Sequence, residues 1–151
     1  MYCSWASSFS ASPSVEKRGR VSTTGVIRVV AAVVERDGRY LITQRRASAV
    51  LPSMWEFPGG RVETGESDTT ALEREVSHRL GVGIRVGRLI SFVSHPYEKY
   101  TVDLYLYEGV LLSESLEARA VAAFRWVTSL EMDGYTFTPA DEASMNKLLG
   151  M

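Results

Sequence analysis

The sequence contains a single cysteine, Cys3, and no long apolar run. One cysteine excludes an intramolecular disulfide, and it excludes a zinc site built from several thiolates. No apolar stretch approaches the roughly 20 residues that a membrane-spanning helix requires. Both features are typical of a protein in a reducing compartment, and we expect a cytoplasmic protein.

The chain also lacks a strong excess of charge of either sign. Its 151 residues include 17 Lys and Arg and 18 Asp and Glu, which gives a formal net charge of -1. Such a balance provides no long-range attraction to a nucleic acid polymer or to an anionic membrane, and we expect neither as a partner. A small phosphorylated ligand needs only a few local cations, so this class of partner stays open. The oligomeric state is not indicated.

The first 25 residues differ in composition from the rest. They are rich in Ser and poor in acidic residues, and they lack the continuous apolar region of a secretory signal. We expect residues 1–25 to form a flexible tail, with a transit peptide as the alternative. The remaining residues, 26–151, have the length and the apolar content of one folded domain.

Patterns of strands and helices begin at residue 26. Runs of β-branched or alternating apolar residues predict strands over 26–34, 40–43, 84–93, 101–112 and 123–127. Ser67 and Gly81 are suited to begin and end one helix, and Thr138 with Pro139 opens a second one. His95, Pro96 and Tyr97 are predicted to lie in a loop. This mixed order predicts an α+β or α/β sandwich.

A stretch over residues 60–82 carries the most informative motif. It resembles the Nudix box, a loop–helix–loop written G-x5-E-x7-R-E-U-x-E-E-x-G-U, in which U is a bulky aliphatic residue. Seven box positions match at the required spacing: Gly60, Glu66, Arg74, Glu75, Val76, Gly81 and Val82. The flanking residues 44–46, 55–60 and 137–142 are similar to the MutT-like branch, whose members cleave nucleoside triphosphates. The resemblance covers about residues 26–149.

This resemblance implies a Nudix α/β/α sandwich, with a mixed sheet between the box helix and the C-terminal helix. It also implies a hydrolase of nucleoside-diphosphate-linked substrates that uses Mg²⁺ or Mn²⁺. Such hard cations bind carboxylate oxygens, and a helix presents residues i, i+3 and i+4 on one face. In the family this face carries three glutamates, whereas here it carries Glu75, His78 and Arg79. Its formal charge therefore changes from about -3 to about 0.

The box is therefore degenerate at its metal-binding pair, because a guanidinium cannot bind a cation. The loop at 117–123, from which many relatives supply another acid, offers only Glu117. Two functions stay open. The first is a weak or altered MutT-like hydrolase, in which Glu75, Glu66 and the Gly60 carbonyl hold one Mg²⁺ or Mn²⁺ ion weakly. The second is a non-catalytic domain that binds a nucleotide, another diphosphate or a partner, without a metal.

Four residues are candidates for the chemistry: Glu75, Glu66, Arg74 and His78. Glu66 and Arg74 have an alternative role, which is to pair and so brace the loop on the helix. His78 is either an acid or base, or a solvated side chain on the helix surface. Further acids that remain as metal donors are Glu56, Glu63 and Asp103.

Substrate binding is assigned to four other residues: Arg45, Arg79, Asp141 and Phe57. Arg79 is expected either to hold a phosphate or to pair with Glu75, four residues earlier. Asp141 is expected either to accept a hydrogen bond from the amino group of cytosine or adenine, or to close a capping box at the start of the last helix. Arg45, or its neighbour Arg46, either binds phosphate or is an ordinary solvated charge.

Overall fold

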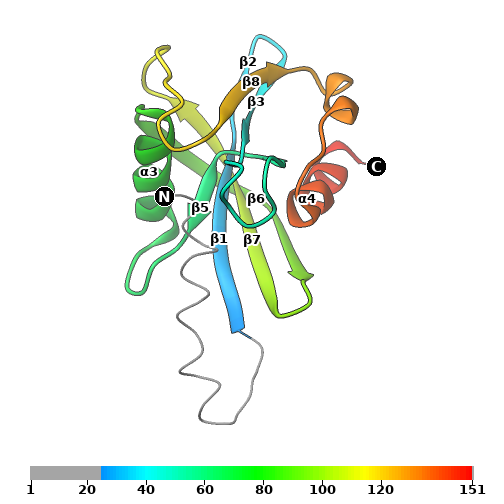
Figure 1. The fold of residues 1–151 in the computed structure, drawn as a ribbon. Helices are drawn as coiled ribbons and strands as arrows, with labels where there is room; N and C mark the ends of the chain where they lie inside the picture. The colour runs from blue at the N-terminus through cyan, green and yellow to red at the C-terminus, as the bar shows by residue number, and fades with distance from the viewer. Residues whose placement is uncertain (1–24, 151) are drawn as a thin grey trace.

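The computed structural model describes residues 25–150 of the chain (Figure 1). The predicted tail, residues 1–25, lies outside the described residues except for Gly25. This glycine is the first residue of strand β1 (Gly25–Val33), so the strand begins one residue before the predicted start at residue 26. Within residues 25–150, no helix is both long enough and apolar enough to cross a membrane.

A mixed sheet forms the centre of the domain. Its strand order is β5 (Gly59–Arg61), β1, β7 (Tyr100–Leu111) and β6 (Ile84–Pro96). Strands β1 and β7 are parallel, whereas β5 pairs with β1 and β6 pairs with β7 in the antiparallel sense. The mixed sheet that the Nudix resemblance implied is thus confirmed.

A second, antiparallel sheet is built around β3 (Arg39–Gln44). It contains β2 (Glu35–Arg36), β4 (Trp55–Glu56) and β8 (Ala123–Val127), each of which pairs with β3. Between β4 and β5 the chain has only Phe57 and Pro58, so it crosses from one sheet to the other within two residues. This short crossing brings Glu56 and Gly60 toward the same region of the domain.

Two helices cover opposite faces of the mixed sheet. Helix α3 (Asp68–Leu80) begins after Ser67, whose hydroxyl accepts a hydrogen bond from the Thr70 N–H at 3.1 Å, and it ends at Gly81 in a left-handed conformation. Helix α4 (Pro139–Leu149) begins after Thr138, with Pro139 as its first residue. Both helix starts were predicted, because N-cap and proline signals are local in the sequence.

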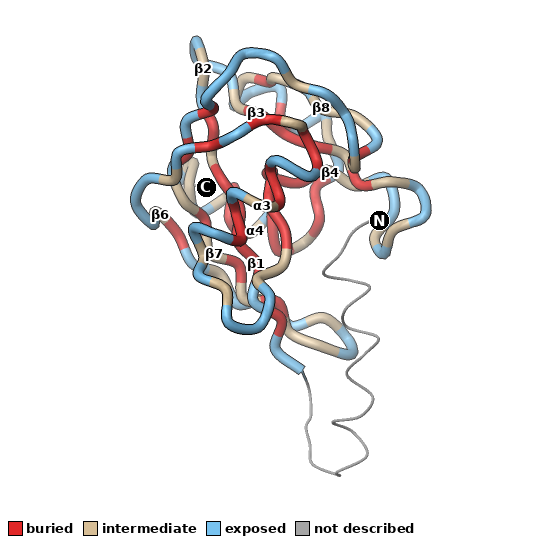
Figure 2. The backbone as a smooth tube through the Cα atoms, turned by 90° about the vertical axis from the view of Figure 1, so that its left-hand side faces the viewer, coloured by how far each residue is buried: buried red, intermediate tan, exposed pale blue. Residues whose placement is uncertain are grey.

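Strand β1 has apolar side chains on both of its faces, so the sheet needs a helix on each side. Its alternate residues Ile27, Val29 and Ala31 pack with Ala140 and Met145 of α4. Val30 and Ala32, which point to the other face, pack with Leu72 and Val76 of α3. Figure 2 shows that the buried parts of the chain gather at the centre of the domain and that the exposed parts lie around its edge. The predicted α/β/α sandwich is therefore confirmed.

One prediction about β6 was wrong. We expected this strand to end at residue 93 and His95 to lie in a loop, but His95 and Pro96 pair with Val102 and Thr101 of β7. Pairing with a long neighbour extends the strand beyond its apolar run. Pro96 is tolerated because it is the last residue of an edge strand. Of His95, Pro96 and Tyr97, only Tyr97 lies in the loop.

Candidate functional site

The loop before α3 is fixed to the helix by Glu66 and Arg74. Arg74 donates from Nε and Nη2 to the two carboxylate oxygens of Glu66, at 2.7 and 2.8 Å. Its Nη2 also donates to the backbone carbonyl of Arg61 on β5 at 2.9 Å. These hydrogen bonds hold the pKa of Glu66 below its usual range. The loop, β5 and α3 are thus joined at one guanidinium, which sets the position of the next residue, Glu75.

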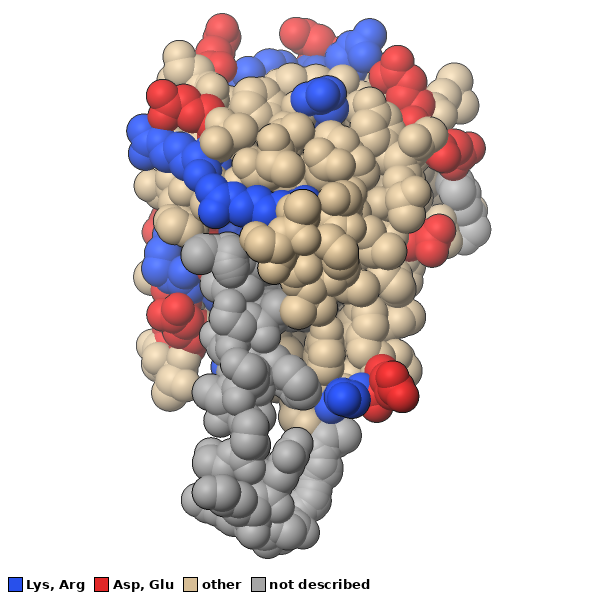
Figure 3. Space-filling view, viewed as in Figure 1, with Lys and Arg blue, Asp and Glu red and all other residues tan. Residues whose placement is uncertain are grey.

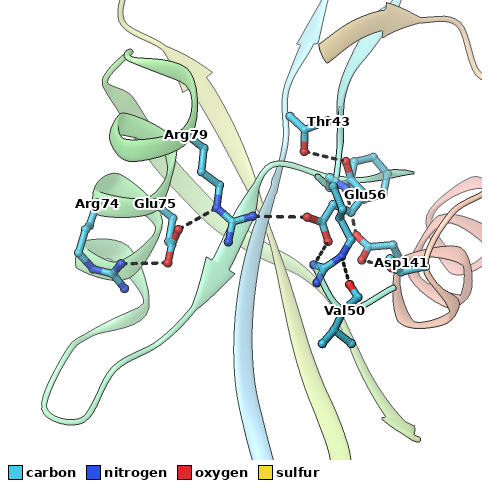
Figure 4. A network of polar contacts seen from close by, with 10 residues as sticks. Thr43, Val50, Glu56, Arg74, Glu75, Arg79 and Asp141 are labelled. Atoms are coloured by element: carbon cyan, nitrogen blue, oxygen red, sulfur yellow. Dashed lines mark hydrogen bonds and ion pairs between the residues drawn. The ribbon is translucent and has the colours of Figure 1, made fainter. Parts of the chain in front are cut away.

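A line of alternating charges crosses the interior between α3 and the second sheet (Figure 4). Glu75 accepts hydrogen bonds from Arg74 Nη1 and Arg79 Nε, each at 2.9 Å. Arg79 Nη1 lies 3.4 Å from Oε2 of Glu56, and Arg45 Nη1 donates to Oε1 of Glu56 at 3.2 Å. The series Arg74, Glu75, Arg79, Glu56, Arg45, hereafter the charge relay, connects α3 with β4 and the residue that follows β3.

All members of the charge relay except Arg74 are buried. The side chains of Glu75 and Arg45 are 1% exposed, and those of Arg79 and Glu56 are 6% and 9% exposed. With three arginines and two glutamates, the relay carries a formal charge of +1. A buried charge is tolerated only when it is paired, and here each carboxylate lies between two guanidinium groups.

The position of Glu75 leaves room only for a glycine at residue 60. A Cβ atom at Gly60 would lie 2.4 Å from the carboxyl carbon of Glu75, which is far inside van der Waals contact. The Glu75 carboxylate therefore lies directly against the backbone of β5. The sequence assigned both residues to one site, and the structure brings them together.

Asp141 lies on the other side of β4, at the start of α4. Its Oδ1 accepts a hydrogen bond from the Phe57 N–H at 3.1 Å, and its Oδ2 accepts one from the Thr138 hydroxyl at 2.7 Å. The predicted capping box is wrong, because the N–H of Thr138 donates to the carbonyl of Trp55 instead. Burial, and then the negative charge of Glu56, raise the pKa of Asp141 to about 7.

The space beside Asp141 is small. A cavity of about 10 Å³, which is room for about one water molecule, is lined by Val29, Glu56, Tyr97, Val102, Leu104, Thr138, Ala140 and Asp141. The Tyr97 hydroxyl accepts a hydrogen bond from the N–H of Ala140 at 3.1 Å, and the side chain of Phe57 is 2% exposed within the core. Binding of a nucleobase here requires these side chains to move.

Several predicted site residues lie outside the charge relay. His78 is exposed on α3, whereas its neighbour Arg79 is buried. Asp103 of β7 accepts a hydrogen bond from the Ser94 hydroxyl of β6, and Glu63 is exposed. A larger cavity, of about 630 Å³, lies between β6, β7 and the end of α4 and includes no member of the relay.

The loop at residues 117–123 meets α3 through its backbone. The N–H groups of Arg119 and Ala120 donate to the carbonyl of Arg79, at 2.9 and 3.1 Å. The carboxylate of Glu117, the one acid expected there, is exposed and pairs with Arg119 at 2.6 Å. Arg46 Nη2 donates to the Arg119 carbonyl at 2.6 Å. On the face drawn in Figure 3, Lys and Arg side chains form a stripe from the left edge toward the centre.

The residues present do not fit a divalent cation. No group of three or more His, Cys, Asp or Glu side chains that could hold a metal ion occurs within residues 25–150. Both oxygens of Glu75 accept hydrogen bonds from arginine, and both oxygens of Glu66 do so as well. A cation at Glu75 would also meet the positive charge of Arg79 at close range.

The comparisons with known proteins agree with the fold and the motif. The family model described as NUDIX domain matches residues 29–147. The CTP pyrophosphohydrolase of Escherichia coli (strain K12) is 34% identical over 116 residues, which cover 77% of this chain and 86% of that protein. A putative 8-oxo-dGTP diphosphatase 2 of Mycobacterium tuberculosis (strain H37Rv) is 36% identical over 120 residues, which cover 75% and 81% of the two chains.

Solved structures show the same architecture. The solution structure of the E. coli ORF135 protein has a TM-score of 0.72 and 30% identity, and the match covers 87% of this chain and 94% of that one. The crystal structure of a MutT protein from Methanosarcina mazei Go1 has a TM-score of 0.75 at 19% identity, covering 86% and 96%, and it supports the fold alone. The chain belongs to the Nudix hydrolase family and is MutT-like.

Proposed function

We propose that this domain binds a nucleoside phosphate and hydrolyses it weakly or not at all. The observation that carries the proposal is the position of Arg79. Its guanidinium lies between the carboxylates of Glu75 and Glu56, at 2.9 and 3.4 Å, on the helix face that holds the metal-binding glutamates in the Nudix box. The ligand class is supported by the relatives, which are a CTP pyrophosphohydrolase and 8-oxo-dGTP diphosphatases.

Weak hydrolysis follows from the electrostatics of phosphoanhydride cleavage. Water must approach a phosphorus atom surrounded by negative oxygens, and a divalent cation normally screens that charge and lowers the pKa of the water. Here the buried acids are neutralised by arginine, and the charge relay has a formal charge of +1. Such a site does not attract a cation, so the largest contribution to catalysis is missing.

Binding of a phosphorylated ligand is compatible with the same charges. The relay has one positive charge in excess, and the exposed Arg119 and the partly exposed Arg46 lie at the end of α3 that carries Arg79. Phosphate oxygens are strong acceptors for guanidinium groups, and they need no metal for this interaction. We therefore expect nucleotide binding that persists in EDTA.

Asp141 supports a preference among bases. Above its pKa of about 7, Asp141 is a carboxylate that only accepts hydrogen bonds, so at pH 8 it favours the amino group of cytosine or adenine over the carbonyl of uracil. In the structure both of its oxygens accept hydrogen bonds from Phe57 and Thr138, but each oxygen has a second lone pair. We expect CTP to bind more tightly than UTP, and we expect Asp141→Asn to reduce the difference.

The decisive experiment combines binding and turnover. Calorimetry with CTP, UTP, GTP and 8-oxo-dGTP, with Mg²⁺ and with EDTA, measures binding, and release of phosphate or pyrophosphate measures hydrolysis. We expect binding, with turnover that is slow or absent. Turnover in Mg²⁺ or Mn²⁺ at a rate ordinary for an enzyme, about 1 s⁻¹ or more, that Glu75→Gln abolishes would overturn the proposal in favour of an efficient hydrolase. Absence of binding to any of the four would overturn it as well.

A gain-of-function variant tests whether the pocket is intact. The double substitution His78→Glu, Arg79→Glu restores the two glutamates of the Nudix box. If only the metal site has been lost, this variant should hydrolyse a nucleotide that the wild type binds, with a rate increase on the order of 10³ or more. Its circular dichroism spectrum provides the control that it folds.

A further inference from the structure

Two buried carboxylates from different elements meet in the interior. Glu75 is on α3 and Glu56 is on β4, and their side chains are 1% and 9% exposed. Left alone, two carboxylates in the interior would be strongly unfavourable, because they lose hydration and repel each other. The fold must therefore provide positive charge between them.

Arg79 provides this charge. One guanidinium donates from Nε to Oε1 of Glu75 at 2.9 Å, and its Nη1 lies 3.4 Å from Oε2 of Glu56. The two remaining carboxylate oxygens face Arg74 at 2.9 Å and Arg45 at 3.2 Å. Arg79 thus contacts both acids. It has the place that a bridging cation between two carboxylates would take.

We propose that Arg79 is a built-in counter-ion that closes a latent divalent-cation site formed by Glu56 and Glu75. Because the counter-ion is a side chain of α3, it joins this helix to Glu56 of the second sheet without any metal. The folded state of the wild type is therefore insensitive to divalent cations and to chelators. Removal of the Arg79 charge opens the site, because hard cations bind carboxylate oxygens. This inference concerns the chain and the ion alone and does not depend on the proposed nucleotide.

The charge balance makes the expected change large. The relay has three arginines and two glutamates, so its formal charge is +1. The substitution Arg79→Glu leaves two arginines and three carboxylates, and the formal charge becomes -1. The substitution Arg79→Gln gives a charge of 0 with a side chain of similar reach. Divalent cations should therefore bind Arg79→Glu most tightly, Arg79→Gln weakly and the wild type not at all.

The test measures thermal unfolding and Mn²⁺ binding, with no nucleotide present. Melting temperatures are recorded in EDTA and in millimolar Mn²⁺, and binding is measured by calorimetry. We expect the wild type to melt at the same temperature in both. We expect Arg79→Glu to be less stable in EDTA and to gain about 3 °C or more in Mn²⁺, since a ligand that binds the folded state raises its stability.

Two controls assign the effect to this site. Arg85→Glu makes the same charge change at an exposed position on β6, outside the charge relay, and should show no response to Mn²⁺. The double variant Arg79→Glu, Glu75→Gln should lose most of the response, because it lacks one of the two original acids. If Arg79→Glu does not fold even in Mn²⁺, Arg79→Gln provides the same comparison.

The proposal is overturned by either of two results. One is a shift of the wild-type melting temperature in Mn²⁺ as large as that of Arg79→Glu, which would mean that Arg79 does not close the site. The other is absence of Mn²⁺ binding to both Arg79→Glu and Arg79→Gln, which would mean that the two acids form no site. Neither result bears on whether the wild type binds a nucleotide, so failure of this inference and failure of the proposed function are distinguishable.

Discussion

Asp141 of α4 accepts a hydrogen bond from the backbone N–H of Phe57 at 3.1 Å, which attaches the start of α4 to the two-residue crossing between the sheets. Burial and the nearby charge of Glu56 raise the pKa of Asp141 to about 7, against an ordinary value of 3.8. Glu56 is also a member of the charge relay, so α4 and α3 are coupled electrostatically through one carboxylate of β4. Because the charge of Glu56 raises the pKa of Asp141, a measurement of this pKa reports on the coupling.

Stability should depend on pH through Asp141. Its raised pKa means that the folded protein holds a proton that the unfolded chain releases between pH 3.8 and about 7. The contribution is fully present below pH 3.8 and is lost as pH rises through about 7, with a slope of at most about 1.4 kcal/mol per pH unit. Urea unfolding of the wild type and Asp141→Asn at pH 5 to 8 measures it.

The asparagine variant is a close match in shape. Its carbonyl oxygen still accepts from Phe57, and its amide still reaches the Thr138 hydroxyl, but it does not titrate. The difference in unfolding free energy between the two proteins should therefore change with pH in this window and level off above it. A difference that stays constant from pH 5 to 8 would contradict a pKa near neutrality.

Gly60→Ala should destabilise the domain through Glu75. The new methyl group would lie 2.4 Å from the Glu75 carboxyl carbon, so β5 or the charge relay must move. We expect a loss of about 2 kcal/mol or more in the free energy of unfolding, as for other overpacked sites. Gly134→Ala is the matched control, because no atom lies within 4 Å of its added methyl group. Equal effects of both substitutions would mean that Glu75 is not held against β5.

The sequence predicted the features that depend on local patterns. Ser67 and Gly81 bound α3 and Thr138 precedes α4, because capping depends on residues within one turn. The pair Glu75 and Arg79 was also foreseen as one of two alternatives, since residues i and i+4 are neighbours on a helix. The MutT-like resemblance supplied the order of the layers.

The sequence could not predict the contacts that the tertiary fold creates. Arg79 and Glu56 are 23 residues apart and lie on different elements, so their meeting depends on how β4 packs beside α3. Glu56 was considered a metal donor, and its role as an acceptor for Arg79 and Arg45 was missed. The extension of β6 to His95 and Pro96 was likewise missed, because it is set by pairing with β7 and not by an apolar pattern.

Glu66→Gln should weaken the attachment of the loop to α3. The glutamate receives two charged hydrogen bonds from Arg74 and its side chain is 12% exposed, so we expect a loss of about 1–2 kcal/mol at pH 7. The lowered pKa of Glu66 means that this stabilisation is present above pH 4.5 and is lost as pH falls through the folded-state pKa. Denaturant unfolding at pH 7 and pH 3 measures the change.

Glu117→Gln provides the comparison for a surface pair. Glu117 pairs with Arg119 at 2.6 Å, but its side chain is 64% exposed and solvent screens the interaction. We expect an effect below about 0.5 kcal/mol. If Glu66→Gln costs no more than Glu117→Gln, then Arg74 does not brace the loop, and its hydrogen bonds to Glu66 contribute no more than a solvated pair.

Tyr107→Phe should loosen the N-terminus of α3. Asp68, in the first turn of this helix, accepts two hydrogen bonds from Arg28 of β1, each at 2.8 Å, and a third from the Tyr107 hydroxyl of β7. Burial, and then this hydrogen bond, raise the pKa of Tyr107 to about 12. Removal of the hydroxyl should lower the free energy of unfolding by about 1 kcal/mol.

A double-mutant cycle isolates this contact from the loss of packing. If the hydroxyl acts through Asp68, then Tyr107→Phe should cost about 1 kcal/mol in the wild type and clearly less in Asp68→Asn, where the acceptor is no longer charged. Denaturant unfolding of the four proteins gives the coupling energy. A coupling near zero would place the effect of Tyr107 in packing against its neighbours and would leave Asp68 held by the hydrogen bonds from Arg28.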